Sequence, residues 1–485
     1  MRRTSISILG LLLVASCSSS LEPTGNGTAA ATSATTGRVI ATLQLTDFRT
    51  QLGELAHRYD VAGVDLESSQ VDLVLDRAEL PALGLTVVRT LDAAATESAL
   101  TASDYPTPDG VAALLHDYAT RYPTLAAVSS VGTSGEGRDI WAIRITKDVG
   151  AHDPKRPVIL FNGAHHAREV MSVQVPIDTI DTLLTGYGTD PKITHWVDSN
   201  EIWVLPMFNV DGSNRVFTTD QLWRKNTDGC PASGTCASGT GVDINRNYPY
   251  GWASCDGSST STSADDYHGP SAGSEAETKT MMGFVTQIRP VFDISYHSYS
   301  ELVLYPYGCD GQHVPSAALV ADIGGKMAAK LPLDATPTRS YQAGSPWELL
   351  YSADGGDMDW MFHERAVLAY AIEVNGSRAG FHPAYSTWRD KTVTKLRGAW
   401  ELLLDRLDGS GVRGFVHDAG GAVTDASVSV TSSSTNEARP ANADGTFHVV
   451  TLPATYHVTV AASGHTTFTQ DVTVADTRVD LDITL

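Results

Sequence analysis

Apolar strand-like runs alternate with helical segments over residues 105–407, and this alternation limits the possible folds more than any other feature of the sequence. Strands whose residues are apolar on both faces are typical of a parallel sheet that is covered by helices on both sides. We therefore expect an α/β domain with a mixed, mostly parallel central sheet flanked by helices. Four runs are expected to be its central strands: residues 158–162, 202–206, 291–296 and 367–372.

Three of these runs are followed at once by side chains that can bind a metal ion or a proton. The first run leads to His166 and Glu169, the third to His297, and the fourth to Glu373. Ligand sites in open α/β sheets form outside the carboxyl ends of the strands, so these side chains are expected to meet. Two histidines and one glutamate would leave a fourth zinc position open for water, as a catalytic site requires. Taken alone, the H-x-x-E spacing favours a solvent-exposed pair of His166 and Glu169, with His297 as a core histidine.

The first residues indicate export. Two arginines precede an apolar run, residues 6–15, which is too short to span a bilayer. The run ends in the letters LVASC, which resemble a bacterial lipobox with Cys17 as the lipidated residue. We expect residues 1–17 to be a signal peptide and residues 18–38 a flexible tether. The protein would then be a lipoprotein of the bacterial cell envelope, or a secreted protein if Cys17 is incidental, and only the lipid would contact a membrane.

Four further cysteines remain, which is an even number in an exported chain. Two disulfides are therefore expected. Of the three possible pairings we favour Cys230 with Cys236 and Cys255 with Cys309. No two of the four have a CxxC spacing, which argues against a zinc site made of cysteines.

The charge balance bears on the partners of the protein. The net charge is -22, from 34 Lys and Arg against 56 Asp and Glu. Such a surface opposes binding to phosphate backbones, so we do not expect nucleic acid as a partner. The acidic loops could also bind structural Ca2+, which the sequence does not decide.

Five short motifs resemble, in order and approximate spacing, the site motifs of the carboxypeptidase A/B type metallocarboxypeptidases: GAHHARE (163–169), WRKN (223–226), VDINRN (242–247), SYHSY (295–299) and AIE (371–373). Segments 131–138 and 267–270 also fall where the family has similar sequences. Bacterial carboxypeptidase T is closest in character. The resemblance implies a zinc carboxypeptidase domain over residues 104–408, with one catalytic Zn2+, that hydrolyses the C-terminal peptide bond of peptides or proteins.

The resemblance also implies catalytic roles. His166, Glu169 and His297 would bind the zinc, which lowers the pKa of water to about 7 and polarises the scissile carbonyl. Glu373 matches the general base, which takes a proton from the attacking water and returns it to the leaving amine. Arg224 matches the residue that stabilises the oxyanion of the tetrahedral intermediate, an interaction worth about 3 to 4 kcal/mol.

Capture of a free chain end is the second requirement of an exopeptidase. Asn245, Arg246 and Tyr351 match the residues that bind the terminal carboxylate of the substrate. Arginine suits this task because its planar guanidinium meets a carboxylate with two hydrogen bonds. Arg168 matches a further cationic residue of the substrate site, and Tyr299 of the SYHSY motif belongs to the same group.

The segment YSADGGDMDW (351–360) matches the loop that forms the wall of the pocket for the terminal side chain. Met358 lies at the position that determines selectivity, and an apolar side chain there suggests apolar or aromatic terminal residues. The neighbouring Asp357 could admit Lys or Arg, so mixed specificity is the second expectation. Asp359 matches a position that is usually structural.

Residues 39–95 are expected to form a small α+β domain with the order βαββαβ. Ahead of a peptidase, such a domain suits an inhibitory or chaperoning pro-domain, and an independent accessory domain is the alternative. Residues 91–103 are rich in Ala, Thr and acidic residues, and they read as an exposed linker where processing could occur.

Short alternating segments after residue 409 predict a compact all-β sandwich over residues 411–485. Its segments resemble the transthyretin-like domain that often follows carboxypeptidase domains: GFVHD (414–418), ASVSV (426–430) and DGTF (444–447). The sequence does not distinguish whether this domain aids folding, surface attachment or approach of the substrate.

Two other functions remain open. A peptidase of the same fold could act on peptidoglycan stem peptides, although Asn245, Arg246, Tyr351 and the apolar Met358 argue against it. A catalytically silent binding protein would need to have lost a ligand or the base, and none is missing. We expect a monomer.

Overall fold

The computed structural model describes most of the chain: residues 37–92, 100, 104–151, 153–231, 234–432, 435–442 and 444–485. The expected signal peptide, Cys17, nearly all of the tether and most of the linker lie outside these residues. Arg38, which was expected in the tether, instead begins the first strand, because it pairs in register with Asp76. No helix among the described residues has both the length and the hydropathy that a bilayer crossing requires.

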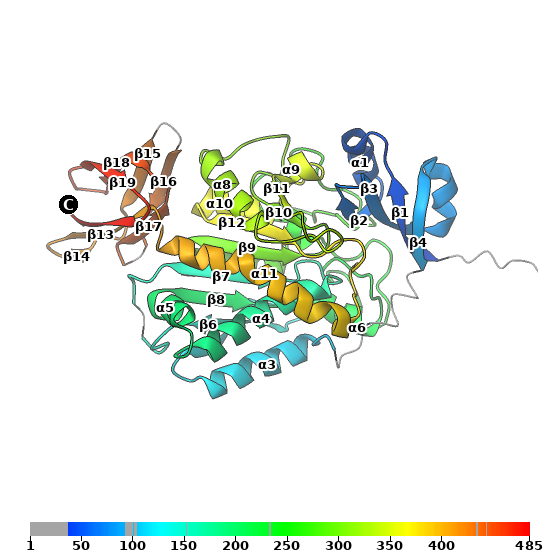
Figure 1. The fold of residues 1–485 in the computed structure, drawn as a ribbon, viewed down its shortest axis with the longest axis horizontal. Coiled ribbons are helices and arrows are strands. Elements are labelled where there is room, and N and C mark those ends of the chain that lie inside the picture. The colour runs from blue at the N-terminus through cyan, green and yellow to red at the C-terminus, as the bar shows by residue number, and fades with distance from the viewer. Residues whose placement is uncertain are drawn as a thin grey trace, which may run out of the picture. The chain divides into compact units, whose positions relative to one another are not determined.

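The N-terminal domain is a four-stranded antiparallel sheet in the order β2-β3-β1-β4 (Figure 1). Helix α1 (Phe48–Ala56) begins where Asp47 accepts a hydrogen bond from the Thr50 amide. The second connection is a 3-10 helix, η1 (Arg77–Leu83), rather than an α-helix; Pro81 lies in it and has no amide hydrogen to donate. The elements otherwise follow the predicted order, with the strands β1 (Arg38–Gln44), β2 (Asp60–Asp65), β3 (Gln70–Asp76) and β4 (Thr86–Asp92).

The second domain contains an eight-stranded mixed sheet in the order β11-β10-β12-β9-β7-β8-β6-β5. The four predicted central strands are all present, lie side by side as β12, β9, β7 and β8, and run parallel. Antiparallel pairings flank them on both sides. The strands are β5 (Ala126–Thr133), β6 (Asp139–Ile145), β7 (Val158–Gly163), β8 (Glu201–Leu205), β9 (Phe292–His297), β10 (Leu302–Leu304), β11 (Gln342–Gly344) and β12 (Leu368–Glu373).

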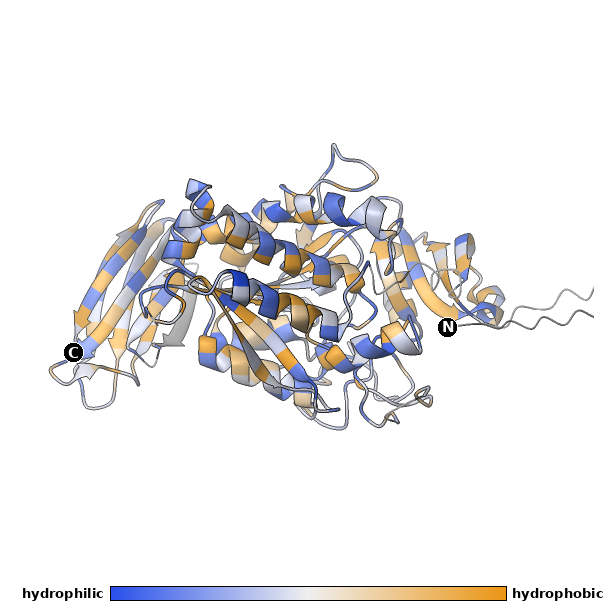
Figure 2. Cartoon of the chain, turned by 90° about the horizontal axis from the view of Figure 1, so that it is seen from below, coloured by the Kyte–Doolittle hydropathy of each residue, from blue (hydrophilic) through white to orange (hydrophobic). Residues whose placement is uncertain are grey.

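Helices cover this sheet. Trp400 of the long helix α11 is fully buried and meets Phe161 of β7 edge to face. Figure 1 shows α11 crossing the strands of the sheet. In Figure 2 the helices carry apolar and polar stretches in turn, as expected for helices with one buried face. The helical elements are α3 (Pro108–Arg121), α4 (Val170–Gly186), α5 (Pro191–Ser199), α6 (Val210–Thr218), η2 (Ile244–Arg246), α7 (Ala276–Ile288), α8 (Ala317–Ala328), α9 (Pro346–Leu349), α10 (Asp357–Arg365) and α11 (Tyr385–Leu407).

Two disulfides join the irregular segments of this domain. Cys230 is bonded to Cys236, and Cys255 to Cys309, which is the pairing that the sequence favoured. The second bond crosses 54 residues and ties the segment after η2 to the segment after β10.

The C-terminal domain is an all-β sandwich with a separate core that includes Val416, Val428 and Val458. One sheet has the order β14-β13-β17, with β20 beside β13, and the other has the order β16-β15-β18-β19. The strands are β13 (Gly411–Asp418), β14 (Gly421–Ala422), β15 (Ser427–Ser432), β16 (Thr435–Pro440), β17 (Thr446–Val450), β18 (Ala454–Ala461), β19 (Phe468–Val474) and β20 (Arg478–Thr484).

Candidate active site

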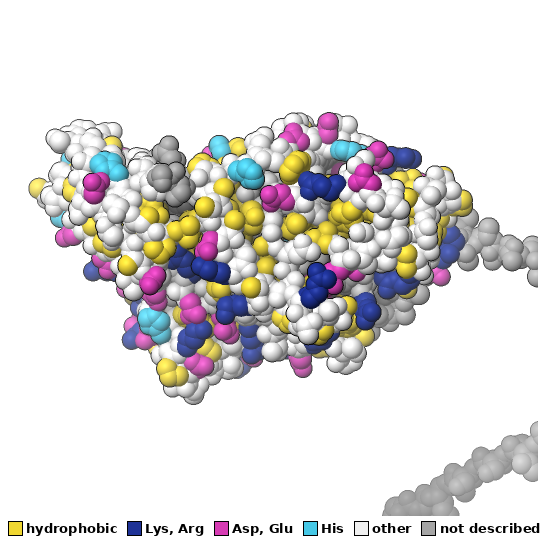
Figure 3. All heavy atoms as spheres, turned by 45° about the horizontal axis from the view of Figure 1, so that its top comes forward, with side chains coloured by type: hydrophobic (Ala, Val, Ile, Leu, Met, Phe, Trp, Pro, Cys, Tyr) yellow, Lys and Arg dark blue, Asp and Glu magenta, His cyan; other side chains and the backbone are white. Residues whose placement is uncertain are grey.

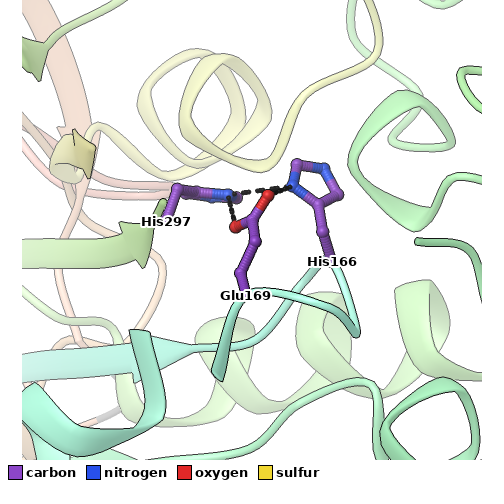
Figure 4. A group of neighbouring side chains, drawn as sticks. All are labelled: His166, Glu169 and His297. Atoms are coloured by element: carbon purple, nitrogen blue, oxygen red, sulfur yellow. Dashed lines mark hydrogen bonds and ion pairs between the residues drawn. The ribbon is translucent and has the colours of Figure 1, made fainter. Parts of the chain in front are cut away.

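The three predicted zinc ligands meet at the carboxyl ends of β7 and β9 (Figure 4). His166 lies in the loop after β7, Glu169 is the N-cap of α4, and His297 is the last residue of β9. Nδ1 of His166 is 2.7 Å from Oε1 of Glu169. Nδ1 of His297 is 3.2 Å from Nδ1 of His166 and also 3.2 Å from Oε2 of Glu169. All three side chains are buried.

The donor set fits a zinc ion. Two imidazole nitrogens and a carboxylate lie within 4.8 Å of one another, and these are the donors of catalytic zinc sites. The second nitrogen of each ring faces a partner: Nε2 of His166 is 3.5 Å from Oδ1 of Asp243, and Nε2 of His297 is 3.1 Å from Oγ of Ser295. Such partners fix the orientation of the ligand rings.

The charges at the triad favour a cation. Burial alone would raise the pKa of Glu169, but the adjacent imidazoles of His166 and His297 outweigh it and hold that pKa well below its usual range. Burial alone would lower the pKa of His297, whereas its hydrogen bond with Glu169 raises it to about 9. A buried anion beside two ring nitrogens therefore attracts positive charge to the point where the three side chains meet.

Glu373 ends β12 and lies in register with His297 on the adjacent parallel strand β9. It lines the same cavity as the three ligands. Loss of solvent contact raises the pKa of Glu373 to about 7, and the negative charge of Glu169 contributes in the same direction. A carboxyl group with this pKa can accept and return a proton near neutral pH.

Arg224 faces this cavity from the segment after α6. Its Nε and Nη2 donate to Oδ2 of Asp243 at 3.1 and 2.8 Å. Burial would raise the pKa of Asp243, but the charges of Arg224 and His166 keep it well below the usual range. One buried carboxylate therefore contacts both a predicted zinc ligand, His166, and the cation predicted to stabilise the oxyanion.

The predicted carboxylate-binding residues Asn245, Arg246 and Tyr351 line the same cavity, whose volume is about 100 Å3. Oδ1 of Asn245 accepts a hydrogen bond of 2.9 Å from the amide of Asp357, so its Nδ2 donor is the group left for a ligand. Arg246 is held by hydrogen bonds from Nε to the Gly257 carbonyl and from Nη1 to the Asn245 carbonyl.

The loop before α10 packs tightly against this group. Gly355 has φ +63°, and a Cβ there would collide with the carbonyl oxygen of Arg246. The Gly355 carbonyl accepts a hydrogen bond of 2.9 Å from the Tyr248 amide. Glycine is thus required where the two loops meet.

Met358 lines the cavity and is almost fully buried, together with the apolar Leu304 and Ala371. Both oxygens of Asp359 accept from the Gly308 amide, at 2.9 and 3.2 Å, in accord with a structural role. Burial raises the pKa of Asp359 to about 7, so its negative charge is weakened at neutral pH.

Asp357, which the sequence suggested as a charge offered to the substrate, lines the cavity beside Met358. Its Oδ1 accepts from the Met358 amide at 2.7 Å, and its Oδ2 lies 3.4 Å from Nε2 of His165. The side chain is buried, so its carboxylate faces protein groups on both sides.

Comparison with known proteins identifies the family. The family model described as zinc carboxypeptidase matches residues 111–395, which is more than half of the chain. The chain belongs to the zinc carboxypeptidase family. Membership implies a metal-dependent hydrolase that acts at C-terminal peptide bonds, with zinc as its cofactor. A second model, described as carboxypeptidase regulatory-like domain, matches residues 411–485.

Individual relatives agree with this assignment. "Zinc carboxypeptidase" of Saccharothrix mutabilis subsp. capreolus is 31% identical over 317 residues, which cover 61% of this chain and 69% of that protein. Carboxypeptidase A1 of Bos taurus is 31% identical over 280 residues, 57% of this chain and 64% of that protein, so the match spans less than two thirds of the bovine protein. The structure of carboxypeptidase A from Helicoverpa armigera has a TM-score of 0.63 at 24% identity, covers 76% of this chain and 96% of that chain, and shows the shared fold.

In this zinc carboxypeptidase the N-terminal domain lies against the catalytic cavity. Val61, Ala62 and Gly63 of β2 line the cavity that contains the triad. The Val64 amide donates to Oγ of Ser300 at 3.0 Å, and a Cβ on Gly63 would collide with Tyr299. Apolar side chains of the two domains form one buried cluster beside the cavity: Ile40, Ala62 and Val74 with Leu222, Tyr299 and Phe381.

Two predicted substrate-binding residues contact acidic groups of that domain. Arg168 donates from Nη1 and Nη2 to the two carboxylate oxygens of Asp60 at 2.5 and 2.7 Å, and its guanidinium lies 4.4 Å from the centre of the Phe381 ring. Tyr299 donates from its hydroxyl to Oδ2 of Asp72 at 2.8 Å. Within the part of the chain that the structure describes, Asp60 is the only carboxylate within 4 Å of Arg168.

Sequence reasoning missed two further residues of this zinc carboxypeptidase site. Asp243 stands in the VDINRN motif, and the need of a zinc-bound histidine for a second partner could have suggested it. His165 directly precedes a ligand, yet nothing in the sequence shows that it faces Asp357. The docking of Asp60 on Arg168 has no sequence signal, because it depends on how two domains pack.

Proposed function

We propose that this protein removes C-terminal residues from peptides and proteins, using zinc held by His166, Glu169 and His297. The observation that carries the proposal is the meeting of these three side chains beside Glu373. A zinc ion supplies Lewis acidity, which polarises a carbonyl group and makes water a stronger acid.

The other catalytic work falls to side chains around the triad. Glu373 takes a proton from the attacking water and then delivers it to the nitrogen of the leaving residue. Arg224, fixed by Asp243, offers a cationic donor to the carbonyl oxygen as negative charge develops on it. A pKa near 7 suits both roles of Glu373, because it must act in turn as a base and as an acid.

Two groups of cavity-lining residues determine that cleavage occurs at the C-terminus and which terminal residues are preferred. The Nδ2 group of Asn245, the Arg246 guanidinium and Tyr351 bind the terminal carboxylate of the substrate. Met358 and its apolar neighbours then receive the terminal side chain, so apolar and aromatic residues are preferred. Basic terminal residues are the second class, because Asp357 lines the same cavity beside Met358.

The N-terminal domain acts as a pro-domain that blocks the cleft in the intact chain. Its strand β2 lines one side of the cavity, and its acidic side chains hold Arg168 and Tyr299. The regulatory-like domain at residues 411–485 aids folding, attachment or substrate approach.

The protein works outside the cytoplasm, where its two disulfides persist. Its net charge of -22 disfavours nucleic acid, and acidic and basic side chains are interspersed over the face in Figure 3. Its partners are instead the C-termini of peptides and proteins, which Asn245, Arg246 and Tyr351 bind.

The test combines metal analysis with a panel of peptides. The zinc-loaded full chain is treated by limited proteolysis and given peptides that differ only in the last residue, each with a free or an amidated end. We expect one zinc per chain, stepwise loss of terminal residues, faster release of Phe or Leu than of Lys, and no cleavage of amidated peptides. Equal cleavage of free and amidated ends would contradict the exopeptidase assignment.

A further inference from the structure

A buried polar pair adjoins the site and has no part in the mechanism above. His165 is fully buried, with Nε2 3.4 Å from Oδ2 of Asp357 and 3.2 Å from the Tyr248 hydroxyl. Its other nitrogen lies 3.3 Å from Oγ of Ser295. The ring thus connects the loop that carries His166 to the first residue of α10.

Asp357 meets three parts of the site. Its carboxylate faces His165 with one oxygen and accepts from the Met358 amide with the other. Its own amide donates to Oδ1 of Asn245 at 2.9 Å. Asp357 therefore contacts three parts of the site: the loop that carries His165 and His166, the wall of the pocket at Met358, and the carboxylate-binding residue Asn245.

Asp243 forms a second connection between Asn245 and the loop that carries His166. Oδ1 of Asp243 accepts from the Asn245 amide at 2.9 Å and lies 3.5 Å from Nε2 of His166. Asn245 is thus held from two sides, through Asp243 toward His166 and through Asp357 toward His165.

We propose that Asp357 and His165 are positioning residues that hold Asn245 and Met358 at a fixed distance from the loop that carries His166, and so keep the binding site for the terminal carboxylate in place. This inference rests on the proposed exopeptidase function. Such an enzyme must hold the terminal carboxylate and the scissile carbonyl at the same time, so a displaced Asn245 weakens the binding of the chain end and raises KM. A pair of buried polar groups between the two binding points supplies that rigidity.

The alternative role for Asp357 is a pocket charge that selects Lys and Arg. The two roles predict different substrate patterns, because a positioning residue affects every substrate that uses the carboxylate-binding residues. A pocket charge affects only peptides with a basic end.

The test is a double-mutant cycle on the zinc-loaded full chain, with every variant treated by the same limited proteolysis. Asp357→Ala and His165→Leu remove the contact, whereas Asp357→Asn and His165→Gln keep polar groups in similar places. For Phe-ended and Lys-ended peptides alike, we expect Asp357→Ala to raise KM about tenfold and to change kcat by less than about threefold. His165→Leu should do the same, the double variant should be no worse than either, and the two conservative variants should recover most of the loss.

Zinc content and thermal unfolding accompany each measurement. Additive effects of Asp357→Ala and His165→Leu on KM would overturn the proposal, since independent structural damage adds. A loss confined to Lys-ended peptides would assign Asp357 to the pocket instead, and an unchanged KM would exclude any positioning role. Failure of the wild type to cleave either peptide would contradict the proposed function itself and is distinguishable from all of these results.

Discussion

His297 and Glu373 stand opposite each other at the ends of two adjacent parallel strands, β9 and β12. Parallel pairing in register places the two side chains on the same face of the sheet, so the backbone hydrogen bonds bring together the proposed zinc ligand and the proposed proton acceptor. Their separation in sequence, with β10, α8 and α10 between them, has no influence on this geometry.

Replacement of Glu373 by Gln tests the base. The amide has nearly the same shape and cannot accept a proton, and the three ligands are untouched, so zinc should stay bound. We expect kcat to fall by about 10² to 10⁴. Metal analysis with steady-state kinetics on free-ended peptides measures both quantities, and normal turnover in this variant would remove Glu373 from the mechanism.

The pH dependence of the reaction should follow the same residue. Burial and the Glu169 charge raise the pKa of Glu373 to about 7, and only the ionised form can accept a proton. Activity should therefore be lost as the pH falls through this pKa, about tenfold per pH unit, and should be retained above it. A bound cation attracts the ionised form and lowers the pKa, so the acid limb should lie at or below pH 7. Measurement of kcat/KM from pH 4 to 8 checks this, and a rate that stays constant down to pH 4 would contradict it.

We expect Arg246 to contribute to binding of the substrate's C-terminus and not to zinc binding. Its Arg246→Ala variant loses a charged hydrogen-bond partner of the terminal carboxylate, an interaction of about 2 to 3 kcal/mol, or roughly a hundredfold in kcat/KM. Zinc content should not change, because Arg246 contacts no ligand of the triad. Comparison of the variant with the wild type on free-ended peptides measures the loss, and an equal loss of zinc would indicate a structural defect instead.

Much of the catalytic domain was predictable from the sequence for a physical reason. Buried parallel strands are continuous apolar runs, so β7, β8, β9 and β12 were visible as such, and their ends marked the side chains of the site. Strands β10 and β11, at one side of the sheet, have three residues each, which is too few to show a periodic pattern. The disulfide pairing and the order of the N-terminal elements were also predictable from the sequence.

Contacts between distant segments were not predictable in the same way. The sequence contains Asp60 and Arg168 as two unrelated charges, and only the docking of β2 on the catalytic domain brings them to 2.5 Å. Asp357 was interpreted as a charge in the substrate pocket because it precedes Met358, and nothing in the sequence indicates that its Oδ2 also lies 3.4 Å from Nε2 of His165.

The pair formed by Asp60 and Arg168 should hold the N-terminal domain over the cleft. Arg168 is buried, so removal of its partner leaves an unpaired buried charge, which costs about 3 to 5 kcal/mol in known cases. In the intact Asp60→Ala variant, the N-terminal domain should therefore separate from the cleft more readily. This variant should cleave free-ended peptides faster than the intact wild type. Arg38 offers a matched control, because it forms the more exposed pair with Asp220, where a contribution below about 1 kcal/mol is expected. If intact Asp60→Ala is as inactive as the wild type, while both become equally active after limited proteolysis, the apolar cluster around Tyr299 rather than the ion pair retains the domain.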